Sequence, residues 1–323
     1  MKERTGWMLT KLPDVFMILT VTLNPCIDKS SKVEILKPES KLRCTEILHE
    51  AGGGGINISK ALKKLDIPSV ALFPAGGHNG DMLCSLLKQE DISFHAVDTK
   101  TETRENWIVL ETQSNNQYRF TFPGREVSEE TIKTLIEQIK SFAPKFVIAS
   151  GSLPPGLPDY FYGLIVKNAL AVGAKCIVDT SGAALQALKG KHAYLIKPNI
   201  GELCKMLNIE WLDKKEVPDA AQQAIRDGFA EIIVVSMGPS GAWMVNNEKK
   251  YFVAAPVVEK RSTVGAGDSM VAGIAAMLLK QRSLKEALAF GVACGSAATM
   301  NEGTKLFNRA DAEHLYEIIS QKE

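Results

Sequence analysis

The sequence TVGAGDSM, residues 263–270, places two glycines and an acid immediately before a long apolar stretch that is typical of a buried helix. Glycine lets the backbone approach a ligand closely, and the free N–H groups at a helix start attract an anion. The sequence AGGGGIN, residues 51–57, also leads into a helical pattern, far away in the chain. The pattern predicts a helix start that binds phosphate at residues 263–270, and a second glycine-rich helix start at residues 51–57.

Asp268 stands beside this predicted anion site, where a phosphate would repel its charge unless a metal ion or a reacting proton accounts for it. A general base that takes the proton of an attacking hydroxyl would account for it. A plain N-cap is the alternative, because Asp is a preferred residue at that position. The glycine run 52–55 also fits a simple tight turn before a helix, so these residues alone leave both alternatives open.

Short apolar runs that end at Gly, Pro, Asn or Asp alternate with helical patterns along much of the chain. Because both faces of these runs are apolar, they predict buried strands of a mostly parallel sheet. The predicted strands are residues 16–23, 69–75, 145–151, 174–180, 193–199 and 231–238. The predicted helices between them are residues 56–66, 81–90, 128–142, 159–172, 200–207 and 217–228. Three further helices are expected from Asp268 to about Ile319, which makes the fold class α/β with a doubly wound sheet flanked by helices.

Residues 29–50 and 105–122 depart from this rhythm. Their alternating apolar and polar residues, with the polar turn SNNQ at residues 114–117, indicate solvent-facing antiparallel strands. We interpret the two stretches together as a small β-lid over one edge of the main domain. No repeat, low-complexity tract or flexible linker separates two domains. We therefore expect one domain over residues 17–323, with residues 1–16 as an N-terminal extension.

Composition excludes several classes of function. With 323 residues, of which 45% are hydrophobic, the chain can bury a sizeable core, and its net charge of +1 provides no overall field for nucleic acid or a membrane. The six cysteines lack metal-ligand spacing, which predicts reduced thiols in a cytoplasmic protein. No apolar run reaches the ~18 residues of a membrane span. The aromatic stretch 105–122 lacks the clustered Lys and Arg of a nucleic-acid platform.

Neither the P-loop pattern nor G-x-G-x-x-G is present, so nucleotide binding would use another scaffold. Ligands of open α/β sheets bind beyond the carboxyl ends of the strands. Six unusual strand ends would gather at that edge, namely LNPCID, FPAGG, SGSLPPG, DTSG, KPN and SMGPSG.

These motifs and their order resemble the PfkB family, the ribokinase-like carbohydrate kinases, from about Met17 to the C-terminus. Finer features are similar to the minor bacterial 6-phosphofructokinases of that family: TLNPCID, KLRCT, AGGGGINISKAL, FPAGG, QYRFTFPG, SGSLPPG, STVGAGDSMVAG and GSAATMNEGTKL. The sister tagatose-6-phosphate kinases and 1-phosphofructokinases also resemble the chain, but they typically carry a lysine in the glycine run. Gly54 stands at that position here, which favours a 6-phosphofructokinase.

The resemblance implies ATP-dependent phosphorylation of fructose 6-phosphate at its 1-hydroxyl, giving fructose 1,6-bisphosphate in glycolysis. It implies that Asp268 is the general base and that the backbone N–H groups of Gly265, Ala266 and Gly267 form the anion hole. The positions that match binding of the sugar and its 6-phosphate are Asp28, Lys41, Arg43, Gly53, Asn57, Arg104 and Ser152. Taken alone, Asn57 fits an ordinary helix-turn residue and the three cations fit surface charges.

The same resemblance implies sites for ATP and for metal ions. The residues that match the nucleotide site are Lys197, Asn199, Ser236, Gly238 and Thr263. Glu202 matches the magnesium region, where Mg²⁺ would keep most of its ligands as water. A monovalent-cation site that implies K⁺ matches Ser262, Val264, Ala298, Asn301 and Gly303.

Two alternative functions stay open beside this one. One is a kinase of another phosphorylated ketose, or of an unphosphorylated sugar or nucleoside, although Lys41, Arg43 and Arg104 argue against an uncharged substrate. A non-catalytic sugar-phosphate binding module on the same fold is the other, and Asp268 after GAG argues against it.

The lid stretches carry aromatic residues that need an apolar partner, and two strands are marginal alone. We therefore expect a homodimer formed through the lid.

Overall fold

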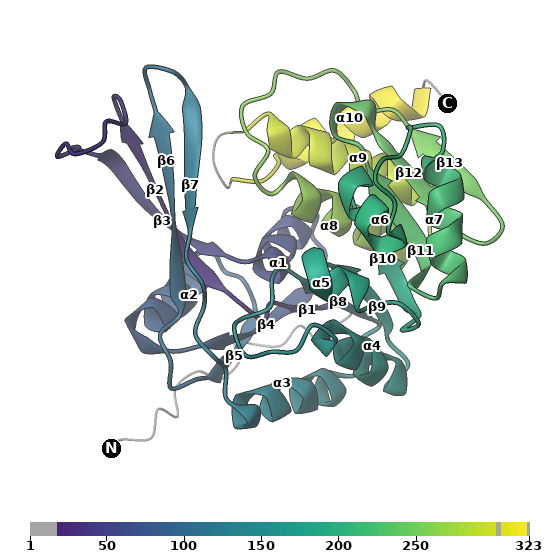
Figure 1. Ribbon diagram of the computed structural model, residues 1–323, viewed down its shortest axis with the longest axis horizontal. Coiled ribbons are helices and arrows are strands. Elements are labelled where there is room, and N and C mark those ends of the chain that lie inside the picture. The colour runs from purple at the N-terminus through teal and green to yellow at the C-terminus, as the bar shows by residue number, and fades with distance from the viewer. Residues whose placement is uncertain (1–17, 302–304, 322–323) are drawn as a thin grey trace.

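The computed structural model describes residues 18–301 and 305–321, which form a large sheet with helices on both faces and a smaller sheet beside it (Figure 1). The strands of the large sheet are β1 (Ile18–Val21), β4 (Ser69–Ala75), β5 (Phe94–Asp98), β8 (Phe146–Ser150), β9 (Lys175–Asp179), β10 (Ala193–Ile196), β11 (Ala230–Ser236), β12 (Ala242–Val245) and β13 (Lys250–Val253). The helices are α1 (Gly54–Lys64), α2 (Gly77–Gln89), α3 (Glu129–Phe142), α4 (Phe161–Ala171), α5 (Gly182–Gln186), α6 (Ile200–Leu207), α7 (Val217–Arg226), α8 (Ala266–Leu279), α9 (Leu284–Thr299) and α10 (Arg309–Gln321), with the 3₁₀-turn η1 (Gly238–Ser240).

The order of the large sheet is β13-β12-β11-β10-β9-β8-β1-β4-β5. The seven strands from β11 to β5 in this order are parallel, and β12 and β13 extend the sheet as an antiparallel hairpin. The chain winds outward in both directions from β1, which lies between β4 and β8. A crevice is expected beyond the carboxyl ends of β1 and β8, because the strand order reverses there.

Two hydrophobic layers cover the faces of this sheet. Apolar residues of α3, α4, α6 and α7 pack on one face, and those of α1, α8, α9 and α10 pack on the other. Figure 1 shows α3 and α4 on the opposite side of the sheet from α1 and α8. No residue of α8 or α9 is exposed, which explains why their sequence is apolar all round and not only on one stripe.

The predicted α/β fold with a doubly wound, mostly parallel sheet is confirmed. The elements that the sequence did not predict are short: β5 at one edge of the sheet, α5 with five residues, and the hairpin β12–β13 with four residues in each strand. Such lengths are too short for a hydrophobic period to show. Helix α2 begins at Gly77, earlier than predicted, because its first turn contains two glycines and no apolar residue.

The two stretches assigned to a lid cover most of the strands of the smaller sheet, whose order is β3-β2-β6-β7, although three of the strands extend up to three residues beyond the predicted bounds. These strands are β2 (Cys26–Val33), β3 (Thr45–Gly52), β6 (Arg104–Glu111) and β7 (Asn116–Thr121). The expectation of antiparallel strands is wrong at the centre of the sheet, where β2 and β6 run parallel. Both strands leave the large sheet in the same direction, so they can only pair in that way. We call these four strands the lid.

One face of the lid carries exposed aromatic side chains. Trp107, Tyr118, Phe120 and Phe122 are between 38% and 46% exposed, whereas Ile108, on the opposite face, is buried.

The six cysteines are unpaired. Cys44, in the loop between β2 and β3, is exposed, and the other five are buried. In the described ranges, no helix is long and apolar enough to cross a membrane. The predicted N-terminal extension lies outside the described residues.

Candidate active site

A polar cleft of about 310 Å³ opens at the carboxyl edge of the large sheet. Its lining residues come from the ends of β8 to β11 and from the starts of α1, α6 and α8: Gly54, Ser150, Gly151, Ser152, Asp179, Thr180, Ser181, Lys197, Asn199, Glu202, Ser236 and Asp268. Stretches that are far apart in the sequence therefore meet where the strand order reverses. The cleft brings Asp268, Lys197, Asn199, Glu202, Ser236 and Ser152 together, as the motifs predicted.

The glycine run 52–55 lets α1 begin directly against the ends of two strands. A Cβ atom on Gly54 would lie 2.2 Å from Ser150 Oγ, and one on Gly55 would lie 2.6 Å from Thr22 Oγ1. Gly53 has φ of 124°, a conformation that favours glycine. Thr22 Oγ1 then accepts the N–H of Ile56 at 2.9 Å, which fixes the first turn of α1. The run is therefore required by close packing as well as by a turn.

Asn57, in the first turn of α1, donates from Nδ2 to Asp268 Oδ2 at 2.9 Å. Burial raises the pKa of Asp268 to about 6, and the carboxylates of Asp179 and Asp28 act in the same direction. The hydrogen bond from Asn57 and the charge of Lys197 oppose this shift. A carboxylate with a pKa near 6 is ionised at neutral pH and is a stronger base than an ordinary Asp.

Lys197 at the end of β10 forms an ion pair with Asp179 at the end of β9, with 3.2 Å between Nζ and Oδ1. Burial alone would lower the pKa of Lys197, but the carboxylates of Asp179, Asp268 and Glu202 outweigh it and raise the pKa. Lys197 is therefore a fixed positive charge at the floor of the cleft. Asp179 is a cleft residue that was not predicted, although it stands in the strand end DTSG.

The start of α8 supplies the backbone that the sequence predicted for an anion. Gly265 is the N-cap with φ of 72°, and Asp268 lies in the first turn. The N–H groups of that turn have no acceptor within the helix. Ala266 makes only a long bond, 3.5 Å, to the carbonyl of Thr263. A Cβ on Gly267 would lie 3.3 Å from Lys197 Nζ, so the helix start and the lysine face the same space.

Asn199 and Glu202 form a capping box at the start of α6. Asn199 Oδ1 accepts the N–H of Glu202 at 2.9 Å, and Glu202 Oε2 accepts the N–H of Asn199 at 2.8 Å. Both side chains therefore have a structural function in addition to lining the cleft. Ser236 pairs with Asn199 in an isolated parallel bridge, and the turn at Gly238 follows directly.

The loop before α8 packs against the C-terminal end of α9. The N–H groups of Arg261 and Ser262 donate to the carbonyl of Thr299, at 2.8 and 3.2 Å. Ser262 Oγ accepts the N–H of Val264 at 3.2 Å. The predicted cation ligands Ser262, Val264, Ala298 and Asn301 thus come from two neighbouring segments, while Gly303 lies outside the described residues.

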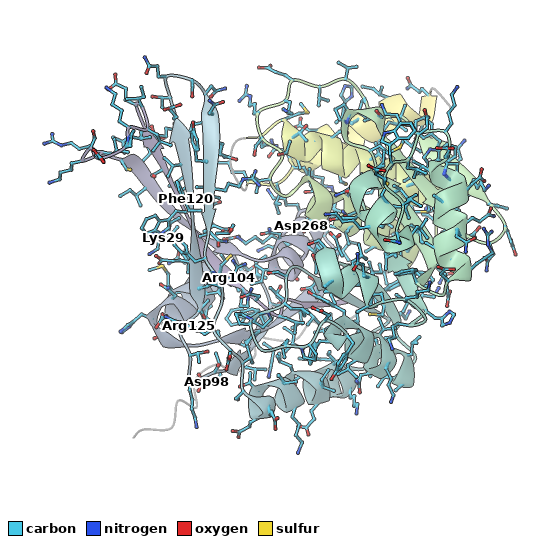
Figure 2. All side chains as sticks on the ribbon, viewed as in Figure 1. Lys29, Asp98, Arg104, Phe120, Arg125 and Asp268 are labelled. Carbon is cyan, nitrogen blue, oxygen red and sulfur yellow. The ribbon has the colours of Figure 1, made fainter. Side chains whose placement is uncertain are left out.

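A second group of predicted residues gathers at the base of the lid, as Figure 2 shows for Arg104 beside the main domain. Asn24 connects two of them: its carbonyl accepts from Arg104 Nε and Nη2, at 3.2 and 3.1 Å, and its Nδ2 donates to Ser152 Oγ at 3.1 Å. Asp28 lies on β2, opposite Asn106 on β6. Sequence reasoning did not single out Asn24, although it stands in the motif LNPCID, and it missed Asn106, which stands in no motif.

Most of the N–H groups of the Arg104 guanidinium are already bonded within the protein. A guanidinium has five N–H groups. Nε and Nη2 each use one on Asn24, and Nη1 uses two, on Asn106 Oδ1 and the carbonyl of Phe122. Within the described residues one N–H of Nη2 is left, so a two-pronged phosphate contact would require one of these bonds to open.

Lys41 and Arg43 are not brought to the cleft. They lie in the exposed loop between β2 and β3, at the end of the lid that points away from the main domain (Figure 1). Within one subunit they are therefore separated from Arg104 by the length of the lid strands.

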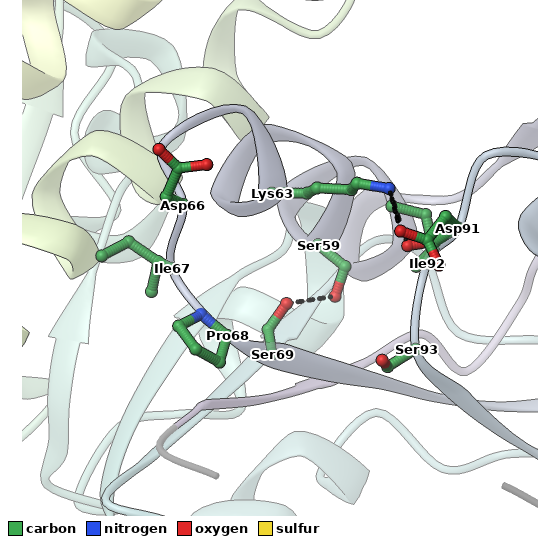
Figure 3. Close-up of a pocket in the computed structure, with 9 residues that line it drawn as sticks. All are labelled: Ser59, Lys63, Asp66, Ile67, Pro68, Ser69, Asp91, Ile92 and Ser93. Carbon is green, nitrogen blue, oxygen red and sulfur yellow. Dashed lines mark hydrogen bonds and ion pairs between the residues drawn. The ribbon is translucent and has the colours of Figure 1, made fainter. Parts of the chain in front are cut away.

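Another pocket, of about 350 Å³, lies near the C-terminus of α1 and the start of β4 (Figure 3). Its one lysine, Lys63, is already engaged by the Asp91 carboxylate and by the carbonyls of Glu90 and Asp91. Because Ser69 starts β4, this pocket lies at the amino edge of the sheet, opposite the cleft. It does not share residues with the cleft.

The pfkB family carbohydrate kinase model matches residues 18–311 of the chain. The chain belongs to the PfkB family of carbohydrate kinases. This kinase is 41% identical to ATP-dependent 6-phosphofructokinase isozyme 2 of Escherichia coli strain K12 over 306 residues, which are 94% of this chain and 99% of that relative. It is 33% identical to 1-phosphofructokinase of Bacillus subtilis strain 168 over 294 residues, 90% of this chain and 96% of that relative.

Solved structures agree with this assignment. The phosphofructokinase-2 of Escherichia coli in complex with potassium matches the kinase with a TM-score of 0.91 and 41% identity, over 94% of this chain and 99% of that one. Ribokinase of Arabidopsis thaliana, with ribose and ATP, is 18% identical with a TM-score of 0.74, over 93% of this chain and 98% of that one. The kinase therefore has the ribokinase-like fold.

We predict that Asn57→Leu raises the pKa of Asp268 further above its value of about 6, because a hydrogen bond that stabilises the carboxylate is lost while burial is kept. Carboxyl ¹³C NMR as a function of pH, with the Asp268 signal assigned by its absence in Asp268→Asn, measures this directly. Asn168→Leu is the matched control, because among the described residues the side chain of Asn168 bonds only to the carbonyl of Leu164 in its own helix. A pKa that stays unchanged or falls in Asn57→Leu would contradict the hydrogen bond.

Proposed function

We propose that this kinase transfers the γ-phosphoryl group of ATP to the 1-hydroxyl of fructose 6-phosphate. The observation that carries the proposal is Asp268, a buried carboxylate with a pKa of about 6 at the start of α8, held by Asn57 in a cleft that also contains the ammonium of Lys197. A base beside a helix start whose free N–H groups attract a phosphate suits the deprotonation of a hydroxyl next to a phosphoryl group.

In the reaction, Asp268 takes the proton of the sugar 1-hydroxyl while the oxygen of that hydroxyl bonds to the γ-phosphorus of ATP. The bond from that phosphorus to the bridging oxygen of ADP breaks, and ADP leaves with the electron pair. The N–H groups of Gly265, Ala266 and Gly267 and the ammonium of Lys197 stabilise the charge on the transferred group. Asn199, Ser236, Gly238 and Thr263 would border ATP.

The cleft suits a magnesium ion that is bound mainly through water ligands. Asp179 and Glu202 offer carboxylates, but one is paired with Lys197 and the other caps α6. Among the described residues no group of three His, Cys, Asp or Glu side chains is arranged to hold a metal ion directly. Bound Mg²⁺ would neutralise the β- and γ-phosphate oxygens while it keeps several water ligands. A K⁺ ion at Ser262, Val264, Ala298 and Asn301 is the second ion that we propose.

At the sugar end, we assign Asp28, Gly53 and Asn57 to the hydroxyls, and Arg104 and Ser152 to the 6-phosphate. Gly54 supports fructose 6-phosphate over the substrates of the sister kinases, because those kinases typically carry a lysine at this position. Lys41 and Arg43 lie at the far end of the lid. Their predicted contact with phosphate therefore requires a dimer in which the loop of one subunit reaches the site of the other.

The substrate is tested by the rate of ADP formation with fructose 6-phosphate, tagatose 6-phosphate, fructose 1-phosphate and fructose. We expect the highest kcat/KM with fructose 6-phosphate and at least about a tenfold lower value with fructose, since loss of a charged hydrogen bond costs about that factor. A clear preference for fructose 1-phosphate or tagatose 6-phosphate would replace the proposed substrate. No turnover of any of them would favour the non-catalytic binding module.

Asp268→Asn should lower kcat by ~10²-fold or more with little change in the dissociation constants of ATP and sugar phosphate, because only the general base is lost. Single-turnover kinetics and titration of each ligand measure the two effects separately. Turnover within a few-fold of the wild-type rate, in a folded variant, would remove Asp268 from the mechanism.

The lid supports a homodimer, because the aromatic side chains on its outer face remain between 38% and 46% exposed in one subunit. We predict that Phe120→Glu dissociates the dimer and weakens binding of the sugar phosphate. Gln117→Glu is the control, because it places the same charge on the opposite face of β7. Light scattering and kinetics on both variants test this, and a fully active Phe120→Glu monomer would show that the lid needs no partner.

A further inference from the structure

The inner face of the lid base is built by two parallel strands in register. Cys26 lies opposite Arg104, and Asp28 lies opposite Asn106. Because side chains alternate along a strand, these four residues share one face. Lys29, Glu105 and Trp107 point to the other face, where Lys29 and Glu105 form an ion pair. Arg104 on the shared face bonds to Asn24, whose amide bonds to Ser152 in the lining of the cleft, so the shared face looks towards the cleft.

The carboxamide of Asn106 joins two of these residues. Its Nδ2 donates to Asp28 Oδ1 at 2.9 Å and contacts Cys26 Sγ at 3.1 Å. Its Oδ1 accepts from Arg104 Nη1 at 2.9 Å. A carboxylate only accepts hydrogen bonds and a guanidinium only donates them. A flipped amide would therefore lose both bonds, so the orientation of Asn106 is fixed by its two neighbours.

The two neighbours depend on Asn106 to different degrees. Arg104 keeps its bonds to the carbonyls of Asn24 and Phe122 without it. The carboxylate of Asp28 would keep only the thiol of Cys26, 3.3 Å away, among the donors of the described residues. A thiol is a weak donor. The position of the Asp28 carboxylate relative to Arg104 is therefore set by one amide side chain.

We propose that Asn106 is a positioning residue that fixes the spacing between Asp28 and Arg104 and so selects ligands that carry a hydroxyl group and a phosphate at that spacing. The inference rests on the proposed function, from which it takes Asp28 as a hydroxyl ligand and Arg104 as a phosphate ligand. A ketose phosphate must be held at both ends at once. Fixing the two protein groups beforehand removes the ordering cost from binding.

The main test compares Asn106→Asp with Asn106→Leu. Asn106→Asp keeps an acceptor for Arg104 but replaces the donor to Asp28 by a like charge, whereas Asn106→Leu removes both bonds at similar size. We expect KM for fructose 6-phosphate to rise at least about tenfold in both. KM for ATP and kcat should stay within about twofold, because Asp268 and Asn57 are untouched. Asn116→Leu, the same exchange at an exposed position of the same sheet, should change neither KM.

A comparison with unphosphorylated fructose separates positioning from general support of the fold. Fructose uses the hydroxyl ligand without the phosphate ligand, so its KM should rise less than that of fructose 6-phosphate in Asn106→Leu. A merely structural residue would change both values equally. If the single variants do not fold, Asp28→Asn combined with Asn106→Asp restores a hydrogen bond of reversed direction. This double variant should melt near the wild-type temperature yet keep a raised KM for the sugar phosphate.

The outcomes distinguish this inference from the proposed function. An unchanged KM for the sugar phosphate in folded Asn106→Asp, or an equal rise in both substrates' KM, would overturn the role of Asn106 while the wild-type activity stands. A wild-type enzyme that prefers another ketose phosphate overturns the proposed substrate, and the same comparison is then made with that compound. A wild-type protein that binds none of the ketose phosphates, measured by thermal shift, overturns both.

Discussion

The absence of Cβ atoms in the glycine run 52–55 is the constraint on which the site depends. At Gly54 and Gly55 the backbone of α1 lies against the ends of β8 and β1 with no room for a side chain. This contact brings Asn57, one turn later, to Asp268, which is 211 positions away in the chain. Bulk at either glycine would push α1 away from the strands and separate the two residues. Packing, more than backbone flexibility, therefore makes these glycines necessary.

The charges in the cleft are arranged at a cost in stability. Asp268 has a raised pKa because burial and the nearby carboxylates of Asp179 and Asp28 disfavour its ionised form. Lys197 limits this cost, and its own charge is kept by the same carboxylates. A buried ion pair contributes little net stability in general. The group is better explained as a set of charges prepared for a phosphoryl transfer, which ATP and the proposed magnesium ion would complete.

The sequence predicted the layers of the fold and the edge where the site forms, because long buried strands and glycine-rich helix starts are strong local signals. It could not predict that β2 and β6 run parallel, since that depends on how two distant segments leave the large sheet. Asp179 and Asn106 were missed for a similar reason: neither stands out locally, and each acquires its role from a partner on another strand. Lys41 and Arg43 show the converse, because a motif matched them while the fold of one subunit holds them away from the cleft.

The lid also gives this protein a natural labelling site. Cys44, in the loop between β2 and β3, is the exposed thiol among six cysteines, and the five others are buried. Burial raises the pKa of Cys26, Cys84, Cys176 and Cys294, which makes those thiols poor nucleophiles at neutral pH. A maleimide dye would therefore attach to the tip of the lid in the wild-type protein. Its anisotropy would report motion of that loop, and energy transfer between two dyes would report how far apart two lids lie.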